Sequence, residues 1–212
     1  MTLPTSGLIT INDRGARAAT TFGSVSADGG NMVFIKKLTA SSSSTLSFVN
    51  GSSGVVLDGT YKEYLFTFKN LHTSSDDDQF KFNFSIDSGS NYNIAKTSTH
   101  FYIINTEGDS NSGPTYYNGG DLAQGTGEQI TTLESGADND ECDAGYLHLF
   151  NPGSTTFVKN FICQMSETGA TPRASSNHIA GYGNTTSAIN AVQFTYHQGN
   201  IDAGDICLYG IS

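Results

Sequence analysis

GNTTSAINAVQFTYHQGNIDAGDICLYGIS, residues 183–212, is the stretch that decides the fold. Within it, Val192, Phe194 and Tyr196 alternate with polar residues, which is the period of two that a half-buried strand requires. A turn-forming segment rich in Gly, Asn and Asp follows, and a second alternating run occupies residues 205–211. The stretch therefore predicts two β-strands joined by a short turn.

The second of these strands is predicted to be covered on both faces. Ile206 and Leu208 share one face, whereas Tyr209 and Ile211 lie on the opposite one. Such a strand is either central in its sheet or pressed against a neighbouring subunit. We therefore expect this strand to be essential for folding.

Similar short runs recur along the chain, and the clearest is residues 80–86, where Phe80, Phe82 and Phe84 alternate with polar residues and predict a central strand. No segment has sustained helical spacing, and about ten short strands are separated by turn signals. This pattern predicts an all-β fold, an antiparallel β-sandwich of the jelly-roll type over residues 32–212, with an extended N-terminal arm over residues 1–31. The other predicted strands are 32–39, 46–48, 55–57, 61–71, 99–105, 130–133, 146–150 and 156–165, and residues 179–182 and 188–192 lead into the C-terminal stretch. The predicted loops include 107–127, 169–177 and a tight turn at 151–153.

Composition supports a folded, turn-dense β protein. Only 14% of the residues are charged, and 24 are Gly, while 13 Phe and 10 Tyr supply large apolar area in regular alternation. Disordered chains lack such aromatic content. The three cysteines, Cys142, Cys163 and Cys207, have neither a disulfide-framework pattern nor zinc-ligand spacing. Cys163 and Cys207 fall in strand runs and are expected to act as small buried hydrophobes.

Charge excludes several partners. The formal net charge is −10, so we expect no nucleic-acid binding, which needs clustered Lys and Arg. Residues 97–158 contain nine acids and no Lys or Arg. That segment is either a solvated acidic face or the outward end of an oriented molecule. No signal peptide is apparent and no apolar run approaches the length of a membrane span, so we expect synthesis in a cytoplasm and no membrane insertion.

No motif for catalysis, a metal or a cofactor stands out. The histidines and cysteines lack metal-ligand spacing, and no phosphate-binding glycine loop is present. The acidic clusters 76–78 and 138–143 lack the spacing of a calcium loop and are expected to be solvated polar loops, with any metal incidental. We therefore expect no cofactor and no enzyme activity. A glycosidase pair of carboxylates stays open, since such a pair requires proximity in space only.

Two segments are candidate binding elements. Leu8, Ile9 and Ile11 in the arm are able to add a short strand to a neighbour's sheet edge, and the alternative is a frayed tail. The predicted loop at 107–127 is long, Gly-rich and acidic, and such loops are often functional. Its candidate residues for a sugar or receptor surface are Tyr116, Tyr117, Asn118 and Asp121, with a tyrosine covering one end of the core as the alternative.

Several phrases of the sequence carry a family resemblance that covers roughly residues 34–212. They are IKKLTASSSSTLSFVNG (35–51), DGTYKEYLFTFKNLH (58–72), YNGGDLAQGTGEQ (117–129), LFNPGSTTFVKNF (149–161), and, in the C-terminal stretch, NTTSAIN, VQF, GNIDAG and LYGIS. Together they resemble a family of β-rich structural proteins of tailed phages, many of them marine. The opening phrase LPTSGLITIND (3–13) resembles a short N-terminal lead on virion appendage proteins, and departs from it at Arg14, where that phrase has an apolar residue.

The resemblance implies a non-enzymatic virion component. It favours a fibre or tail-associated appendage that docks by its N-terminus to other virion proteins, projects its sandwich, and forms a homotrimer. A capsid decoration protein is the first alternative. A carbohydrate-binding module that contacts host-surface glycans, with or without hydrolase activity, is the second.

Overall fold

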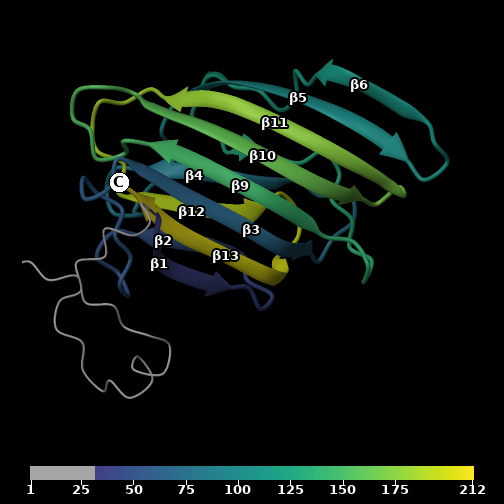
Figure 1. Cartoon of the computed structure of the whole chain (residues 1–212), viewed down its shortest axis with the longest axis horizontal. Helices are drawn as coiled ribbons and strands as arrows, with labels where there is room; N and C mark the ends of the chain where they lie inside the picture. Colours follow the sequence, from purple (N-terminus) through teal and green to yellow (C-terminus); the bar gives the residue numbers. More distant parts are fainter. Residues whose placement is uncertain (1–31) are drawn as a thin grey trace, which may run out of the picture. The chain divides into compact units, whose positions relative to one another are not determined.

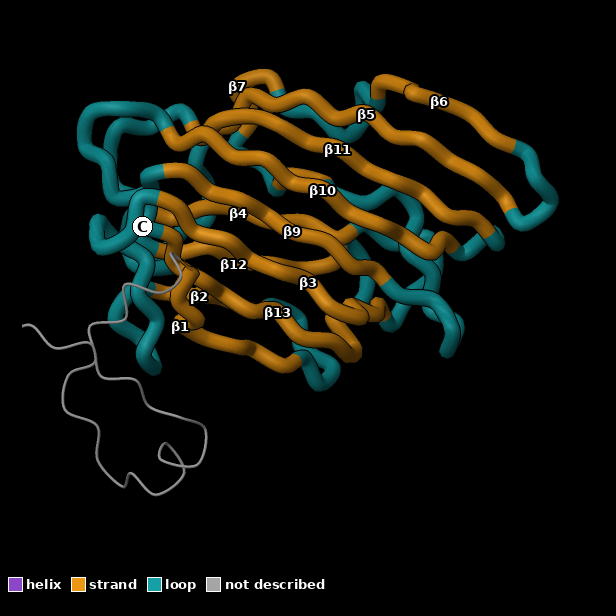
Figure 2. Tube along the Cα trace, in the orientation of Figure 1, coloured by secondary structure: helices purple, strands orange, loops and turns teal. Residues whose placement is uncertain are grey.

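The computed structural model describes residues 32–212, which form strands, turns and loops (Figure 2). Within this range there is no helix, and hence none long and apolar enough to cross a membrane. The strands are β1 (Met32–Thr39), β2 (Leu46–Val49), β3 (Glu63–Thr73), β4 (Phe80–Ser85), β5 (Lys96–Thr106), β6 (Asn111–Tyr116), β7 (Ala123–Gly125), β8 (Gln129–Ile130), β9 (Asp143–Phe150), β10 (Lys159–Gly169), β11 (Arg173–Gly183), β12 (Ala191–Tyr196) and β13 (Ile201–Ile211).

The strands pair into two antiparallel sheets (Figure 1). The larger sheet has the order β1-β13-β3-β9-β10-β11-β5-β6, with β7 also paired to β5, and the smaller has the order β2-β12-β4-β8. The strands β1-β13-β3-β9 and β2-β12-β4-β8 together have the strand order of an eight-stranded jelly roll with two Greek keys. The predicted all-β sandwich of the jelly-roll type is therefore confirmed for residues 32–212, and the predicted arm, residues 1–31, lies outside the described residues. Beyond β9, the larger sheet continues through β10, β11, β5 and β6.

Aromatic side chains fill the space between the two sheets. Phe194 of β12 lies 5.4 and 5.3 Å, between ring centroids, from Phe66 and Phe68 of β3 in the opposite sheet. It also contacts Phe48 and Phe80 in its own sheet, at 6.2 and 5.8 Å. All five rings are buried, and edge-to-face packing adds to the stabilisation from their burial. Because β4 pairs with β12 on one side and β8 on the other, its predicted internal position is confirmed.

The C-terminal strand β13 lies between β1 and β3, inside the larger sheet. Ile206 and Leu208 face the core and are fully buried. On the other face, the Tyr209 ring contacts Phe34 of β1 in an edge-to-face arrangement at 5.6 Å. The predicted division of the two faces is confirmed, and β13 is an internal strand.

Two predicted loops are wrong. Residues 169–177 do not form a loop: β10 runs to Gly169, β11 starts at Arg173, and the two make a hairpin with only three residues between them. Residues 107–127 contain strands β6 and β7, which both pair with β5. These strands were missed because their residues are mostly small and polar. The strands are stabilised by backbone pairing and buried hydrogen bonds, and little by apolar alternation.

The hairpin of β9 and β10, predicted from its turn residues, is present. Its connection spans residues 151–158, so the tight turn expected at 151–153 is only the start of a longer loop. Asn151 adopts a left-handed conformation with φ of 45°, and its carbonyl accepts a hydrogen bond from Ser154 N at 3.0 Å. Asn tolerates this backbone region better than most residues.

The acidic cluster at residues 76–78 is only partly solvated. Asp76 and Asp77 are exposed, whereas Asp78 is fully buried, which corrects the expectation for that residue. Its carboxylate accepts hydrogen bonds from Thr73 Oγ1 and from four backbone N–H groups, those of Gln79, His197, Gln198 and Gly199. Asp78 therefore ties the start of β4 to the turn that follows β12.

Candidate functional site: an uncharged sheet face

Four neighbouring strands of the larger sheet, β9, β10, β11 and β5, have an outer face without a formal charge. Their alternation divides each strand into residues that point to the core and residues that point outward. None of the outward residues of these strands is Asp, Glu, Lys or Arg. They are Ala144, Tyr146, His148 and Phe150 in β9, Asn160, Ile162, Gln164, Ser166 and Thr168 in β10, Ala174, Ser176, His178, Ala180 and Tyr182 in β11, and Thr97, Thr99, Phe101, Ile103 and Asn105 in β5. We call this surface the uncharged face.

The charged residues of the same four strands all lie at inward positions. They are Asp143, Lys159, Glu167, Arg173 and Lys96. Exposed apolar side chains are common on protein surfaces, but buried charges are informative because each one needs partners. The four strands therefore reverse the usual arrangement, in which charge faces water and apolar side chains face the core.

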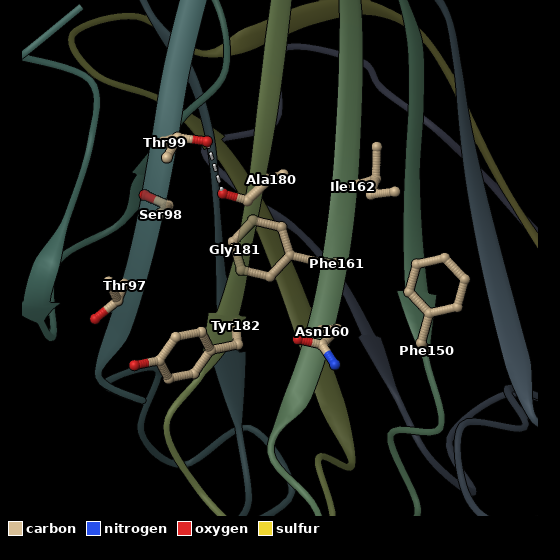
Figure 3. Close-up of a pocket in the computed structure, with 10 residues that line it drawn as sticks. All are labelled: Thr97, Ser98, Thr99, Phe150, Asn160, Phe161, Ile162, Ala180, Gly181 and Tyr182. Carbon is tan, nitrogen blue, oxygen red and sulfur yellow. Dashed lines mark hydrogen bonds between the residues drawn. The ribbon is translucent and has the colours of Figure 1, made fainter.

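The uncharged face is hollowed near the end where β9 and β11 stop and β10 and β5 begin (Figure 3). An open hollow of about 460 Å³ has apolar walls formed by Phe150 and Ile162 on one side and Tyr182 on the other. Gly181 lies at its floor, and a Cβ there would come within 2.8 Å of the Phe161 ring, so a side chain at this position would force the strands apart.

A second hollow of about 220 Å³ continues the first. Both are lined by Thr99, Ile162 and Ala180, which lie opposite one another across β5, β10 and β11. In the next row the Phe101 ring stacks on His178, with centroids 4.9 Å apart and planes 11° apart. The two rows together make a continuous apolar surface with both hollows and projecting rings.

At one end of the strands, the inward charges are two lysines. Lys96 Nζ donates to Asn83 Oδ1 at 2.6 Å and to Ile94 O at 2.9 Å. Burial lowers the pKa of Lys96 to about 7, against a smaller opposing effect of Glu128. Lys159 Nζ donates to the Phe157 and Thr185 carbonyls, and burial lowers the pKa of Lys159 too.

At the other end, the inward charges are two acids and an arginine. Asp143 Oδ2 accepts hydrogen bonds from Ser135 Oγ at 2.6 Å and from Tyr196 OH at 2.7 Å. Burial, aided by the neighbouring Glu167 charge, raises the pKa of Asp143 to about 8. Asp143 is therefore mostly protonated at neutral pH.

Glu167 is held as a carboxylate acceptor. It accepts from the Leu133 and Glu134 backbone N–H groups at 2.6 and 3.0 Å, and from Asn177 Nδ2 at 3.0 Å. Arg173 lies 3.5 Å from it, and 2.7 Å from the exposed Glu134. Asp143 and Glu141 are both buried, so the expected solvated loop at residues 138–143 is wrong at those two positions.

The structure separates the predicted glycan or receptor residues. Tyr116, at the end of β6, pairs with Phe101 and so lies at the border of the uncharged face. Its hydroxyl donates to Asp121 Oδ2 at 2.7 Å, and this hydrogen bond raises the pKa of Tyr116. Asn118 is exposed.

Tyr117 lies apart from Tyr116. Its ring packs against His100 at 5.2 Å between centroids, and its hydroxyl accepts from Gln79 Nε2 at 3.2 Å. It lines a separate polar hollow of about 660 Å³ together with Asp77, Gln79, Tyr102, Ile104, Leu133, Glu134 and Arg173. Only Tyr116 and Asp121 are thus brought together as predicted. The predicted docking residues Leu8, Ile9 and Ile11 lie outside the described residues.

The chemistry available at the uncharged face is that of a binding surface. Its polar groups are amides, hydroxyls and two imidazoles. Among residues 32–212, no group of three or more His, Cys, Asp or Glu side chains is arranged to hold a metal ion. Burial of aromatic and aliphatic surface is the main free energy this face offers.

The uncharged face was not among the features predicted from the sequence, although the sequence of β10 contains a signal for it. In β10, KNFICQMSETG, the charged Lys159 and Glu167 fall in the same alternate positions as the apolar Phe161, Cys163 and Met165. When the charged residues of a strand occupy the same alternate positions as its core residues, the outward positions of that strand carry no charge.

Comparison with known proteins adds no relative: no family model, no curated protein and no solved structure matches the chain. The resemblance to phage structural proteins stays a prediction from the sequence phrases.

Proposed function

We propose that the chain is a non-enzymatic structural component of a tailed-phage virion. In this proposal it is a fibre or tail-associated appendage protein that docks through residues 1–31, projects its jelly roll and assembles as a homotrimer. Two independent observations support the proposal: the phrases that resemble phage structural proteins, and a sandwich whose exposed sheet face suits protein contact. The second carries it.

The observation is the reversed charge placement in β9, β10, β11 and β5. A freely projecting monomer gains nothing from placing five ionisable side chains on the inner side of the sheet while it exposes a broad uncharged face. A protein that is built into an assembly does gain, because the uncharged face is then removed from water. Assembly is the defining property of a virion component.

The proposal is tested by recovering particles. The phage that encodes this chain is grown and its particles are banded on a density gradient, and their proteins are identified by mass spectrometry. We expect the chain in the banded particles at a fixed ratio to the major head protein. Immunogold labelling then distinguishes a tail position from a head position, and a head position would support the capsid decoration alternative. Absence of the chain from intact particles would reject the proposal.

The arm is tested by deletion of residues 1–31. The truncated chain is expected to keep the melting temperature of the whole chain but to lose incorporation into particles. Normal incorporation of the truncated chain would place the docking surface within residues 32–212.

One observation favours the carbohydrate-binding alternative. Tyr116 and Asp121 are hydrogen-bonded to each other, and Tyr116 is half exposed, so an aromatic ring and a carboxylate are presented side by side. That function would be supported if the chain is absent from particles, binds glycans on an array, and loses this binding in Tyr116→Ala.

A further inference from the structure

We infer that the uncharged face is the surface through which copies of this chain pack against one another. The inference deepens the proposed function, on which it rests for the expectation of a homo-oligomer, and it names both the contact surface and the partner.

The charge placement indicates that the face is removed from water. In these four strands a charge would be accommodated at no cost on the outer face, yet Lys96 and Lys159 are fully buried and hold their nitrogens on carbonyl and amide oxygens. Asp143 and Glu167 are likewise buried on the inner side. A charge buried in a protein contact is costly unless it is paired. An outer face without any charge avoids that cost.

The partner that fits is a second copy. Each chain carries a formal charge of −10, so two copies repel each other over most orientations. Exposed acids lie in the loops at the ends of the sandwich, such as Asp77, Asp109 and Asp140. The uncharged face is the broad surface of the described chain on which two acidic copies meet without opposing carboxylates. A basic partner would instead be attracted to the acidic loops.

The size of the face matches a stable contact. Four strands about 4.8 Å apart and about 30 Å long present roughly 600 Å² in projection. A stable interface buries about 800 Å² per partner, so the projected area is of the order that a stable contact needs. The face ends at β3, where Glu63 lies 2.9 Å from His148. The face has both hollows and projecting side chains. Ala180 lines a hollow, whereas Phe101, Ile103 and Ile162 are exposed by 40–47%. One copy therefore offers projections that are able to enter hollows of another.

The test uses the full chain at increasing concentration in sedimentation-velocity runs. Wild-type protein is expected to sediment as an assembly of identical copies. Ile162→Glu, which puts a carboxylate where the two hollows meet, is expected to weaken the association by more than about a hundredfold. The matched control is Ile86→Glu, because Ile86 has a similar exposure of 40% but lies at the end of β4, away from the face.

Ala180→Glu provides a second variant at the floor of the hollow, and both variants are checked for an unchanged circular-dichroism spectrum and melting in the dilute state. A wild-type chain that stays monomeric throughout the micromolar range overturns the inference. So does an Ile162→Glu or Ala180→Glu chain that is folded and associates as wild type does. A monomer whose face binds a glycan is a third overturning result.

The outcomes separate the inference from the proposed function. If copies associate through the face but the chain is absent from particles, the proposed function fails alone. If the chain is present in particles and folded Ile162→Glu still associates, the inference fails alone.

Discussion

The inner and outer faces of the sheet formed by β9, β10, β11 and β5 differ in a direction opposite to most exposed sheets. The inner face combines apolar residues with five charged ones, whereas the outer face has hollows, aromatic rings and no formal charge. The inner charges are held by hydrogen bonds within one chain, and the outer apolar surface has no partner within residues 32–212. If copies pack through the outer face as inferred above, the exposed apolar surface of one chain is buried by the next.

Adjacent residues of one strand give the sharpest test of this difference. Phe161 and Ile162 follow each other in β10, but Phe161 is 1% exposed and Ile162 is 47% exposed. Phe161→Ala removes a ring that packs against Phe82 and Phe84, and we expect it to lower the free energy of unfolding by about 3–5 kcal/mol.

Ile162→Ala is expected to cost less than about 1 kcal/mol when the chain is monomeric. Urea unfolding of both variants at a concentration below association measures the two values. Equal losses would show that the outer face is part of the core of a single chain.

The acidic end of the inner face gives a pH effect. The pKa of Asp143 is raised from 3.8 to about 8, so between these values the folded chain binds a proton that the unfolded chain lacks. The contribution of Asp143 to the free energy of unfolding is therefore lost as the pH rises from about 4 to about 8. The titratable groups near Asp143 are Glu167, Asp78 and Tyr196.

Asp143→Asn replaces the protonated carboxyl with an uncharged side chain of the same shape. We expect the variant to lose less stability as the pH rises, so that its melting temperature near pH 8 is higher than that of wild type. The exposed Asp140→Asn is the control and should retain the wild-type pH profile. Thermal melts at pH 5, 6, 7 and 8 decide between them, and a wild-type slope in Asp143→Asn would mean that another group titrates.

The lysine end is expected to respond in the opposite direction. The pKa of Lys96 is lowered from 10.5 to about 7, so in that window the unfolded chain binds a proton that the folded chain lacks. Stability from this residue is gained as the pH rises and is lost as the pH falls towards 7. Lys96→Met should remove this dependence, while exposed Lys62→Met should leave it in place. Melts between pH 7 and 9.5 test the sign, and a steeper rise in Lys96→Met would contradict it.

The smallest expected effect is at the border of the uncharged face. Tyr116→Phe removes the hydrogen bond to Asp121 but leaves an exposed ring. An exposed hydrogen bond contributes little to stability because water takes the place of the lost partner. The free energy of unfolding should therefore change by less than about 0.5 kcal/mol. Chemical denaturation measures this, and a loss comparable to that of Phe161→Ala would assign the pair to the core.

The jelly roll was predictable where large apolar residues alternate with polar ones. Phe80, Phe82 and Phe84 in β4 and Val192 and Phe194 in β12 show the period directly, and burial follows from it. The same reasoning missed the start of β11. There the inward residues Ser175 and Asn177 are polar. Asn177 is buried because it hydrogen-bonds to Glu167 and to His100, two residues that lie on different strands.

Charged residues misled the sequence analysis in a similar way. Asp78 follows two exposed aspartates and looks solvated, yet it is buried because backbone N–H groups converge on it from the turn after β12. A carboxylate's environment depends on those distant donors. The uncharged face was missed for a related reason: the functional signal lies in how four strands combine, and no single strand displays it.

Hydroxyl-radical footprinting of the unmodified chain measures whether the uncharged face is covered when copies associate. Phe101, Ile162 and Tyr182 on the uncharged face and Ile86 away from it are compared at low and high protein concentration, with oxidation read by mass spectrometry. We expect Phe101, Ile162 and Tyr182 to become protected as copies associate, while Ile86, as exposed as Phe101 in the single chain, is oxidised at an unchanged rate. Oxidation of the face residues at the same rate at both concentrations, in a sample that sedimentation shows to be associated, would contradict it.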